Sequence, residues 1–157
     1  LPAQAPADTP APADAPAQPS PPADERSKPT GLPKEVAADI ARLTTEMYLS
    51  EMEPVLIPAQ AYAQMAHSAI DRVPIDEIDG RVSAVLLTPY PPGIPLLIPG
   101  ERINARLVNY LKFAREFNAK FPGFETDIHG LVKLKKNGVT EYFVDCVRDV
   151  EAARSVR

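Results

Sequence analysis

Proline is spread unevenly along this chain, and that distribution limits which parts of it can fold. Ten of the 19 prolines fall within residues 1–33, which also contain no aromatic residue and no isoleucine, valine or methionine. Proline has no backbone N–H to donate, and a segment so poor in apolar side chains cannot offset the entropy lost on ordering. We therefore predict a disordered, Pro/Ala-rich linker over 1–32, a folded domain over 33–150 and a flexible tail over 151–157.

A second proline-rich stretch, TPYPPGIPLLIPGE (88–101), lies inside the expected domain. Five of its fourteen residues are proline, yet its apolar residues are those of a buried strand. The preceding RVSAVLLT predicts a strand, because its apolar character is continuous. Since proline is confined to strand edges, we expect a rigid connection next and then a short edge strand. Tyr90 and Glu101 would stand at the two ends of this stiff segment.

Helices and a terminal hairpin account for the rest of the expected domain. Apolar residues at spacings of three and four predict three helices, the last with Asn104 as its N-cap. Asn137-Gly138 separates two strand-like segments and is the strongest two-residue hairpin signal. The predicted α+β domain thus has helices at about 33–50, 58–70 and 104–120, and strands at about 81–88, 94–98, 129–136 and 139–147.

Composition argues against several functional classes. The net charge is −4 and the basic residues are dispersed, so no nucleic-acid surface is expected. No apolar run approaches the roughly 18 to 20 residues of a membrane span. Cys146 is the only cysteine, which excludes an intramolecular disulfide and favours a reducing, cytoplasmic location. The first residues lack signal-peptide features and an initiator methionine, so we expect a piece of a longer protein.

The two histidines are the obvious candidates for chemistry. Neither has the cysteine or histidine neighbours of a zinc site, so no metal site is expected, and His67 is interpreted as structural. His129 lies two residues after Asp127, a spacing that puts both side chains on one face of a strand. The favoured interpretation is a hydrogen-bonded pair at the start of the hairpin. The alternative is a pair that supports a nearby active site.

Tyr90 and Glu101 also carry two interpretations each. Tyr90 could be half-buried with its hydroxyl bonded at an edge, or it could line a pocket from a rigid loop. Glu101 could offset the dipole of the following helix, worth about 0.3–1 kcal/mol. It could instead receive an ammonium or guanidinium group.

Two long strings resemble a known family. IDGRVSAVLLTPYPPGIPLLIPGERI (78–103) and YLKFAREFNAKFPGFETDIHGL (110–131) resemble the C-terminal domain of the bacterial ornithine/lysine/arginine decarboxylases. These enzymes are pyridoxal-phosphate-dependent and have the aspartate-aminotransferase fold. FPGFETDIHG is more similar to the arginine and lysine branches. The resemblance implies a carboxy-lyase that forms agmatine or cadaverine, both polyamine precursors.

The resemblance also implies what this chain lacks. In the family a lysine in a Ser-x-His-Lys-type motif holds the cofactor in a Schiff base, and no lysine here follows a histidine. We therefore expect no catalytic residue in this chain, with pyridoxal phosphate held by the central domain of the parent enzyme. The implied substrate-binding residues are Tyr90 and Glu101, at the rim of the substrate entrance. The implied assembly is a homodimer or decamer.

A different class of function stays open. The chain could be a freestanding binding or regulatory module that kept the fold of this domain and lost the enzyme. The coding sequence upstream of Leu1 discriminates the two hypotheses, because only the enzyme requires the cofactor-lysine motif there.

Overall fold

A computed structural model describes residues 33–90 and 93–156. The predicted linker, 1–32, lies outside the described residues, as do Pro91 and Pro92. Helices and antiparallel strands alternate along the described chain, so the α+β prediction is confirmed.

The three predicted helices are present, with a fourth near the C-terminus. The second is shorter than predicted because the backbone leaves the helix at His67, and Ser68 has a φ of 57°. No helix in the described ranges is long and apolar enough to cross a membrane. The helices are α1 (Lys34–Tyr48), α2 (Pro58–Ala66), α3 (Ala105–Lys120) and α4 (Val150–Arg154).

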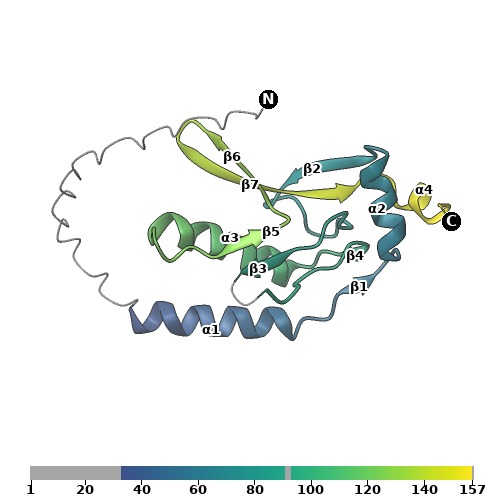
Figure 1. Cartoon of the computed structure of the whole chain (residues 1–157). Coiled ribbons are helices and arrows are strands. Elements are labelled where there is room, and N and C mark those ends of the chain that lie inside the picture. Colours follow the sequence, from purple (N-terminus) through teal and green to yellow (C-terminus); the bar gives the residue numbers. More distant parts are fainter. Residues whose placement is uncertain (1–32, 91–92, 157) are drawn as a thin grey trace, which may run out of the picture. The chain divides into compact units, whose positions relative to one another are not determined.

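Three small antiparallel sheets connect these helices (Figure 1). The largest has the order β2-β7-β6, and its β6–β7 hairpin turns at Asn137-Gly138 as predicted. The other two are pairs, β1–β4 and β3–β5. The strands are β1 (Glu53–Pro54), β2 (Ile70–Pro74), β3 (Thr88–Tyr90), β4 (Glu101–Arg102), β5 (Asp127–His129), β6 (Val132–Lys136) and β7 (Val139–Val147).

The predicted strands at 81–88 and 94–98 are wrong in their extent. Residues 81–87 make only isolated bridges, among them Ser83 with Cys146 and Leu87 with Leu97. The Ser83 hydroxyl bonds both the N–H and the carbonyl of Val85, a local turn that competes with a continuous ladder. In 94–98, Pro95 has no N–H to donate, so the pairing is confined to Leu87 with Leu97.

Two further predictions need correction. The segment 129–136 is not one strand, because Gly130, at φ +94°, separates β5 from β6. The predicted flexible tail at 151–157 instead contains most of α4. Asp149 caps this helix by accepting the Ala152 N–H, and Ala153 is fully buried.

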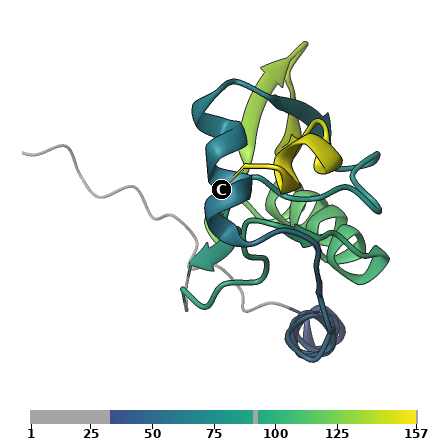
Figure 2. The ribbon, with the colours of Figure 1, turned by 90° about the vertical axis from the view of Figure 1, so that its right-hand side faces the viewer.

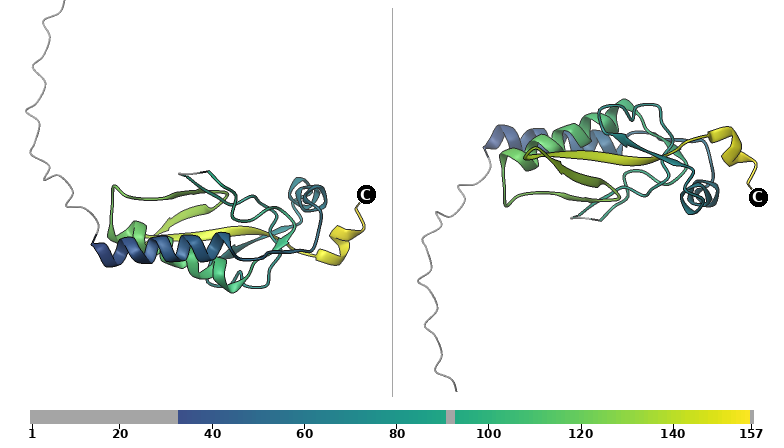
Figure 3. Two further views of the ribbon diagram at one scale, coloured as in Figure 1. Left: turned by 90° about the horizontal axis from the view of Figure 1, so that it is seen from below. Right: turned by 90° about the horizontal axis from the view of Figure 1, so that it is seen from above.

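Two apolar clusters hold the elements together. The main cluster lies between α3 and the strands and includes Leu107, Leu111, Ile128 and Val144. The smaller one lies where α2 meets α4, at the end of the molecule opposite the hairpin turn (Figure 3). α1 packs on α3 at the edge of the domain and is seen along its axis in Figure 2. The smaller cluster comprises Leu56, Ala61, Val82, Ala84, Val147 and Ala153.

Gly130 gives a direct test of the β5–β6 break. A Cβ on Gly130 would overlap the carbonyl oxygen of Leu86, whereas one on Gly123, at nearly the same positive φ, would meet nothing. Both Gly→Ala changes introduce strain, because the backbone is left-handed at each position, but only Gly130→Ala adds a steric clash. We expect Gly130→Ala to lower the free energy of unfolding by about 1–3 kcal/mol more than Gly123→Ala, measured by urea denaturation. Equal losses would contradict the close approach.

Asn104 gives a second test, because its side chain has two separable roles. Its Oδ1 accepts the Leu107 N–H and caps α3, while its Nδ2 donates to Ser50 Oγ at 2.7 Å. Asn104→Asp keeps the cap and loses the donor, and Asn104→Ala loses both. We expect Asn104→Ala to cost about 1 kcal/mol more stability than Asn104→Asp, measured by chemical denaturation. If the two variants unfold alike, the cap contributes nothing.

Candidate functional site

The β3–β5 ribbon gathers several of the residues singled out in the sequence. Its register places Tyr90 opposite Asp127 and Thr88 opposite His129. Residues directly opposite each other in an antiparallel pair share a face, so these four side chains form one surface, here called the polar ribbon face. Pro89 and Ile128 occupy the other face of the ribbon and are buried.

Asp127 and His129 share a face as predicted, but the hydrogen bond goes elsewhere. Lys133 Nζ donates to Asp127 Oδ1 at 2.6 Å, while His129 Nε2 lies 3.6 Å from Asp127 Oδ2. The hydrogen bond from Lys133 is the main cause that holds the pKa of Asp127 below its usual range. Because Lys133 belongs to β6, this contact ties β5 to the hairpin, in place of the predicted hydrogen bond between Asp127 and His129.

Tyr90 is one of the two exposed rings of this surface, together with His129. Its side chain is 63% exposed, and its ring contacts that of His129 edge-on, with centroids 6.4 Å apart. On the same face, Thr88 Oγ1 is buried without a hydrogen-bond partner among the described residues. The polar ribbon face therefore presents a phenol, an imidazole and a carboxylate to whatever covers it.

Glu101 lies in different surroundings from Tyr90. It belongs to β4, and its Oε2 accepts the Ile98 N–H at 2.7 Å, which closes the turn at Pro99-Gly100. The cap of α3 is Asn104, as predicted, and Glu101 makes no hydrogen bond to that helix among the described residues. Glu101 lines a hollow of about 190 Å³ whose other walls include Tyr48, Met52 and Ile98.

The remaining candidates make no catalytic group. His67 is exposed at the C-terminal end of α2, where its backbone N–H donates to the Ala63 carbonyl, and its structural role stays a prediction. Cys146 is buried, and burial raises the pKa of its thiol to about 11, so it is a poor nucleophile at neutral pH. Within 33–90 and 93–156 no cluster of histidine, cysteine, aspartate or glutamate could hold a metal ion.

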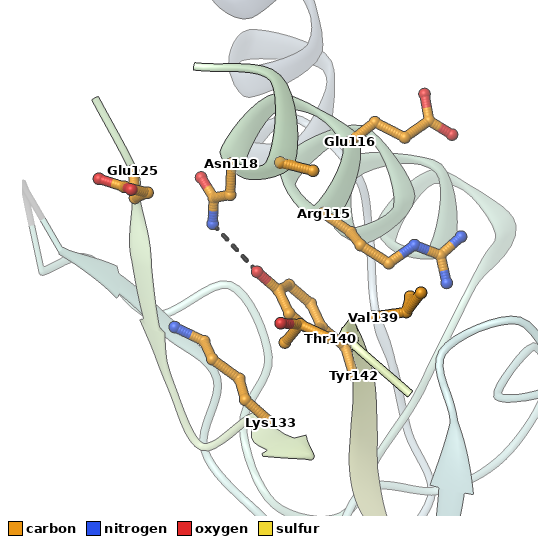
Figure 4. A pocket seen from close by; sticks show the side chains of 10 residues that line it. Arg115, Glu116, Asn118, Glu125, Lys133, Val139, Thr140 and Tyr142 are labelled. Carbon is orange, nitrogen blue, oxygen red and sulfur yellow. Dashed lines mark hydrogen bonds between the residues drawn. The ribbon is translucent and has the colours of Figure 1, made fainter. Parts of the chain in front are cut away.

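A cavity of about 690 Å³ was not anticipated from the sequence. It lies between the C-terminal half of α3 and the β6–β7 hairpin (Figure 4). Asn118 lies in one wall of the cavity. Its Nδ2 donates to Tyr142 Oη at 3.2 Å and to the Thr126 carbonyl, and its Oδ1 accepts the Thr126 N–H. The basic side chains that line the cavity are already in ion pairs, Arg115 with Asp76 and Lys133 with Asp127. The cavity thus has few free polar groups with which to select a ligand.

Comparison with known proteins identifies the fold and the family. Residues 41–148 match the model of the Orn/Lys/Arg decarboxylase, C-terminal domain. The chain is 39% identical over 112 residues to lysine decarboxylase LdcA of Pseudomonas aeruginosa, covering 69% of this chain and 15% of that protein. It is 42% identical over 79 residues to the inducible lysine decarboxylase of Escherichia coli K12, covering 48% of this chain and 11% of that protein.

A solved structure gives the same result. The constitutive lysine decarboxylase of E. coli superposes with a TM-score of 0.64 at 30% identity, over 72% of this chain and 16% of that one. The chain spans only 11–15% of the length of the two curated relatives named above. Because the family model covers most of the described domain, the chain belongs to the Orn/Lys/Arg decarboxylase family, as its C-terminal domain.

Proposed function

We propose that this chain is the C-terminal domain of a pyridoxal-phosphate-dependent decarboxylase of basic amino acids, acting in the cytoplasm. The observation that carries the proposal is the family match over residues 41–148, which includes both the polar ribbon face and the proline-rich segment. The domain shapes the rim of the substrate entrance and contributes subunit contacts. Lysine is the first candidate substrate, because the relatives at 39% and 42% identity are lysine decarboxylases. Arginine is the second.

The two lysines described in ion pairs, Lys112 and Lys133, do not fit a cofactor-binding role. A lysine that forms a Schiff base is activated by desolvation or by a neighbouring cation. Lys112 and Lys133 are instead more than a third exposed and paired with carboxylates, so neither condition is met. In the proposal, pyridoxal phosphate is therefore held by parts of the parent enzyme outside this chain, and no covalent step involves a residue described here.

Glu101 and Tyr90 are the proposed contacts with substrate. The bond from Ile98 N–H orients the Glu101 carboxylate through Oε2, and Oε1 has no partner among the described residues. A carboxylate held in this way suits the distal cation of a basic amino acid. Tyr90 is exposed, and the β3–β5 pairing orients its side chain outward. These features support a contact of Tyr90 with substrate at a different point of the rim from Glu101.

Exposed apolar side chains support the proposed domain and subunit contacts. Leu86, Ile94 and Ile98 are 43–52% exposed and lie, with Tyr90, in or just before the proline-rich segment. Apolar groups that gather on one surface mark sites of protein contact. We assign these exposed residues to packing against the central cofactor domain and a second subunit, in a homodimer or a decamer.

The proposal predicts that the purified 157-residue chain is inactive. Incubation with equimolar pyridoxal phosphate and borohydride should label no single lysine stoichiometrically, and lysine or arginine should release no carbon dioxide. The parent enzyme, treated in parallel, should gain the cofactor mass and decarboxylate. Covalent labelling of this chain at a single lysine would overturn the assignment. A coding sequence that starts just before Leu1 would favour the freestanding module.

The rim role predicts a selective effect of Tyr90→Phe in the parent enzyme. Removing one hydroxyl that contacts substrate should lower kcat/KM by about three- to tenfold. Tyr62→Phe is the matched control, because Tyr62 is 66% exposed on α2, away from the β3–β5 ribbon. Lys135→Ala, a change at an exposed position of β6, is a second control. If all three variants have the same kinetics, Tyr90 is not a substrate contact.

A further inference from the structure

We propose that the cavity between α1, α3 and β3 is a binding site for a small, uncharged aromatic molecule that hydrogen-bonds to the hydroxyl of Tyr110. α1 lies along α3 at the edge of the domain (Figures 1 and 2), and the space between them is about 140 Å³. The site is called the α1–α3 cavity below. Its walls are Ile40, Thr44, Tyr48, Pro89, Tyr110, Phe113, Ala114, Phe117 and Thr126.

The lining of the α1–α3 cavity selects against charged ligands. Among the described residues no acidic or basic side chain lines it, and four of the nine lining residues are aromatic. A charged molecule would lose its hydration there without gaining a counter-ion. A basic amino acid is therefore excluded, so the inference is independent of the substrate proposed above. Aromatic walls favour a planar ring, which can stack or meet them edge-on.

The volume limits the ligand to a single ring. Sites for drug-sized molecules occupy about 300–1,000 Å³, so this cavity is too small for a nucleotide or another large ligand. An apolar cavity of about 150 Å³ is large enough to bind benzene. The space exists because short side chains face each other across the helix pair, Thr44 on α1 and Ala114 on α3.

Tyr110 supplies the polar contact. It is only 7% exposed, and its hydroxyl has no hydrogen-bond partner within the described part of the chain. Tyr48, on the facing helix, differs because its hydroxyl donates to the Ile94 carbonyl at 3.3 Å. Burial raises the pKa of Tyr110 to about 12, so the phenol stays protonated and can donate at neutral pH. A donor that has no protein partner among the described residues and stands in a cavity wall favours a ligand that carries one acceptor.

Binding should also tighten the contact of α1 with α3. Along α1 only Met47 is fully buried, and Ile40 and Thr44 are half-exposed beside the cavity. A ring in the cavity would contact both helices at once. A ligand that binds only the packed arrangement stabilises it by mass action.

The test uses the whole 157-residue chain and two probes, phenol and benzene, titrated by methyl NMR at Ile40 and Ala114. We expect saturable binding of both probes. Tyr110→Phe should weaken phenol about three- to tenfold and leave benzene unchanged, because only phenol can pair with the hydroxyl. Thr44→Leu, which fills the space, should abolish binding of both. Thr45→Leu is the matched control, since Thr45 is exposed and does not line the cavity.

Several outcomes would overturn the proposal. These are non-saturable shifts, binding that survives Thr44→Leu, or a Tyr110→Phe variant that binds phenol as well as the wild type does. Far-UV circular dichroism must show each variant folded. If Thr44→Leu unfolds, the Tyr110→Phe comparison of phenol with benzene still decides the result, because it removes one hydroxyl and leaves the cavity shape intact.

Discussion

Strand β7 is the element on which the rest of the described domain depends. Its first half pairs with β6 and its second half with β2, and Cys146 also bridges to Ser83. Val144 is buried in the main cluster, and Val147 in the smaller one beside α2 and α4. One strand thus supplies backbone partners to three segments and apolar side chains to both clusters. Parts of the chain far apart in sequence are held together through it.

Proline limits where such pairing can continue. The segment 93–100 cannot add a full strand, so Leu87 and Leu97 meet in a single bridge and the chain turns at Gly100. Beyond Leu87, β3 then pairs with β5 instead. This exchange of partners brings Tyr90 beside His129 and leaves Glu101 in a separate hollow. The backbone N–H groups that proline lacks therefore influence which of the candidate site residues lie next to each other.

The β3–β5 ribbon separates two surfaces of opposite chemistry. One side carries Tyr90, Asp127 and His129, suited to a polar or charged partner. On the other side Pro89 forms part of the wall of the α1–α3 cavity, which is uncharged. Strand alternation produces this division, since successive side chains point to opposite faces. The proposed entrance rim and the proposed aromatic site can therefore be tested by separate substitutions.

The sequence by itself determined the α+β class, the helix at α3 with its Asn104 cap and the hairpin at Asn137-Gly138, because these depend on local spacing and turn chemistry. It also determined the family, since two long strings of residues match it. Only the tertiary structure decided the broken pairing of 81–88 and 94–98, the helix α4 and the separation of Glu101 from Tyr90. Neither the cavity at Tyr110 nor the contact of Lys133 with Asp127 has a local signal. Each depends on which distant segments meet, and burial and long-range backbone pairing decide that.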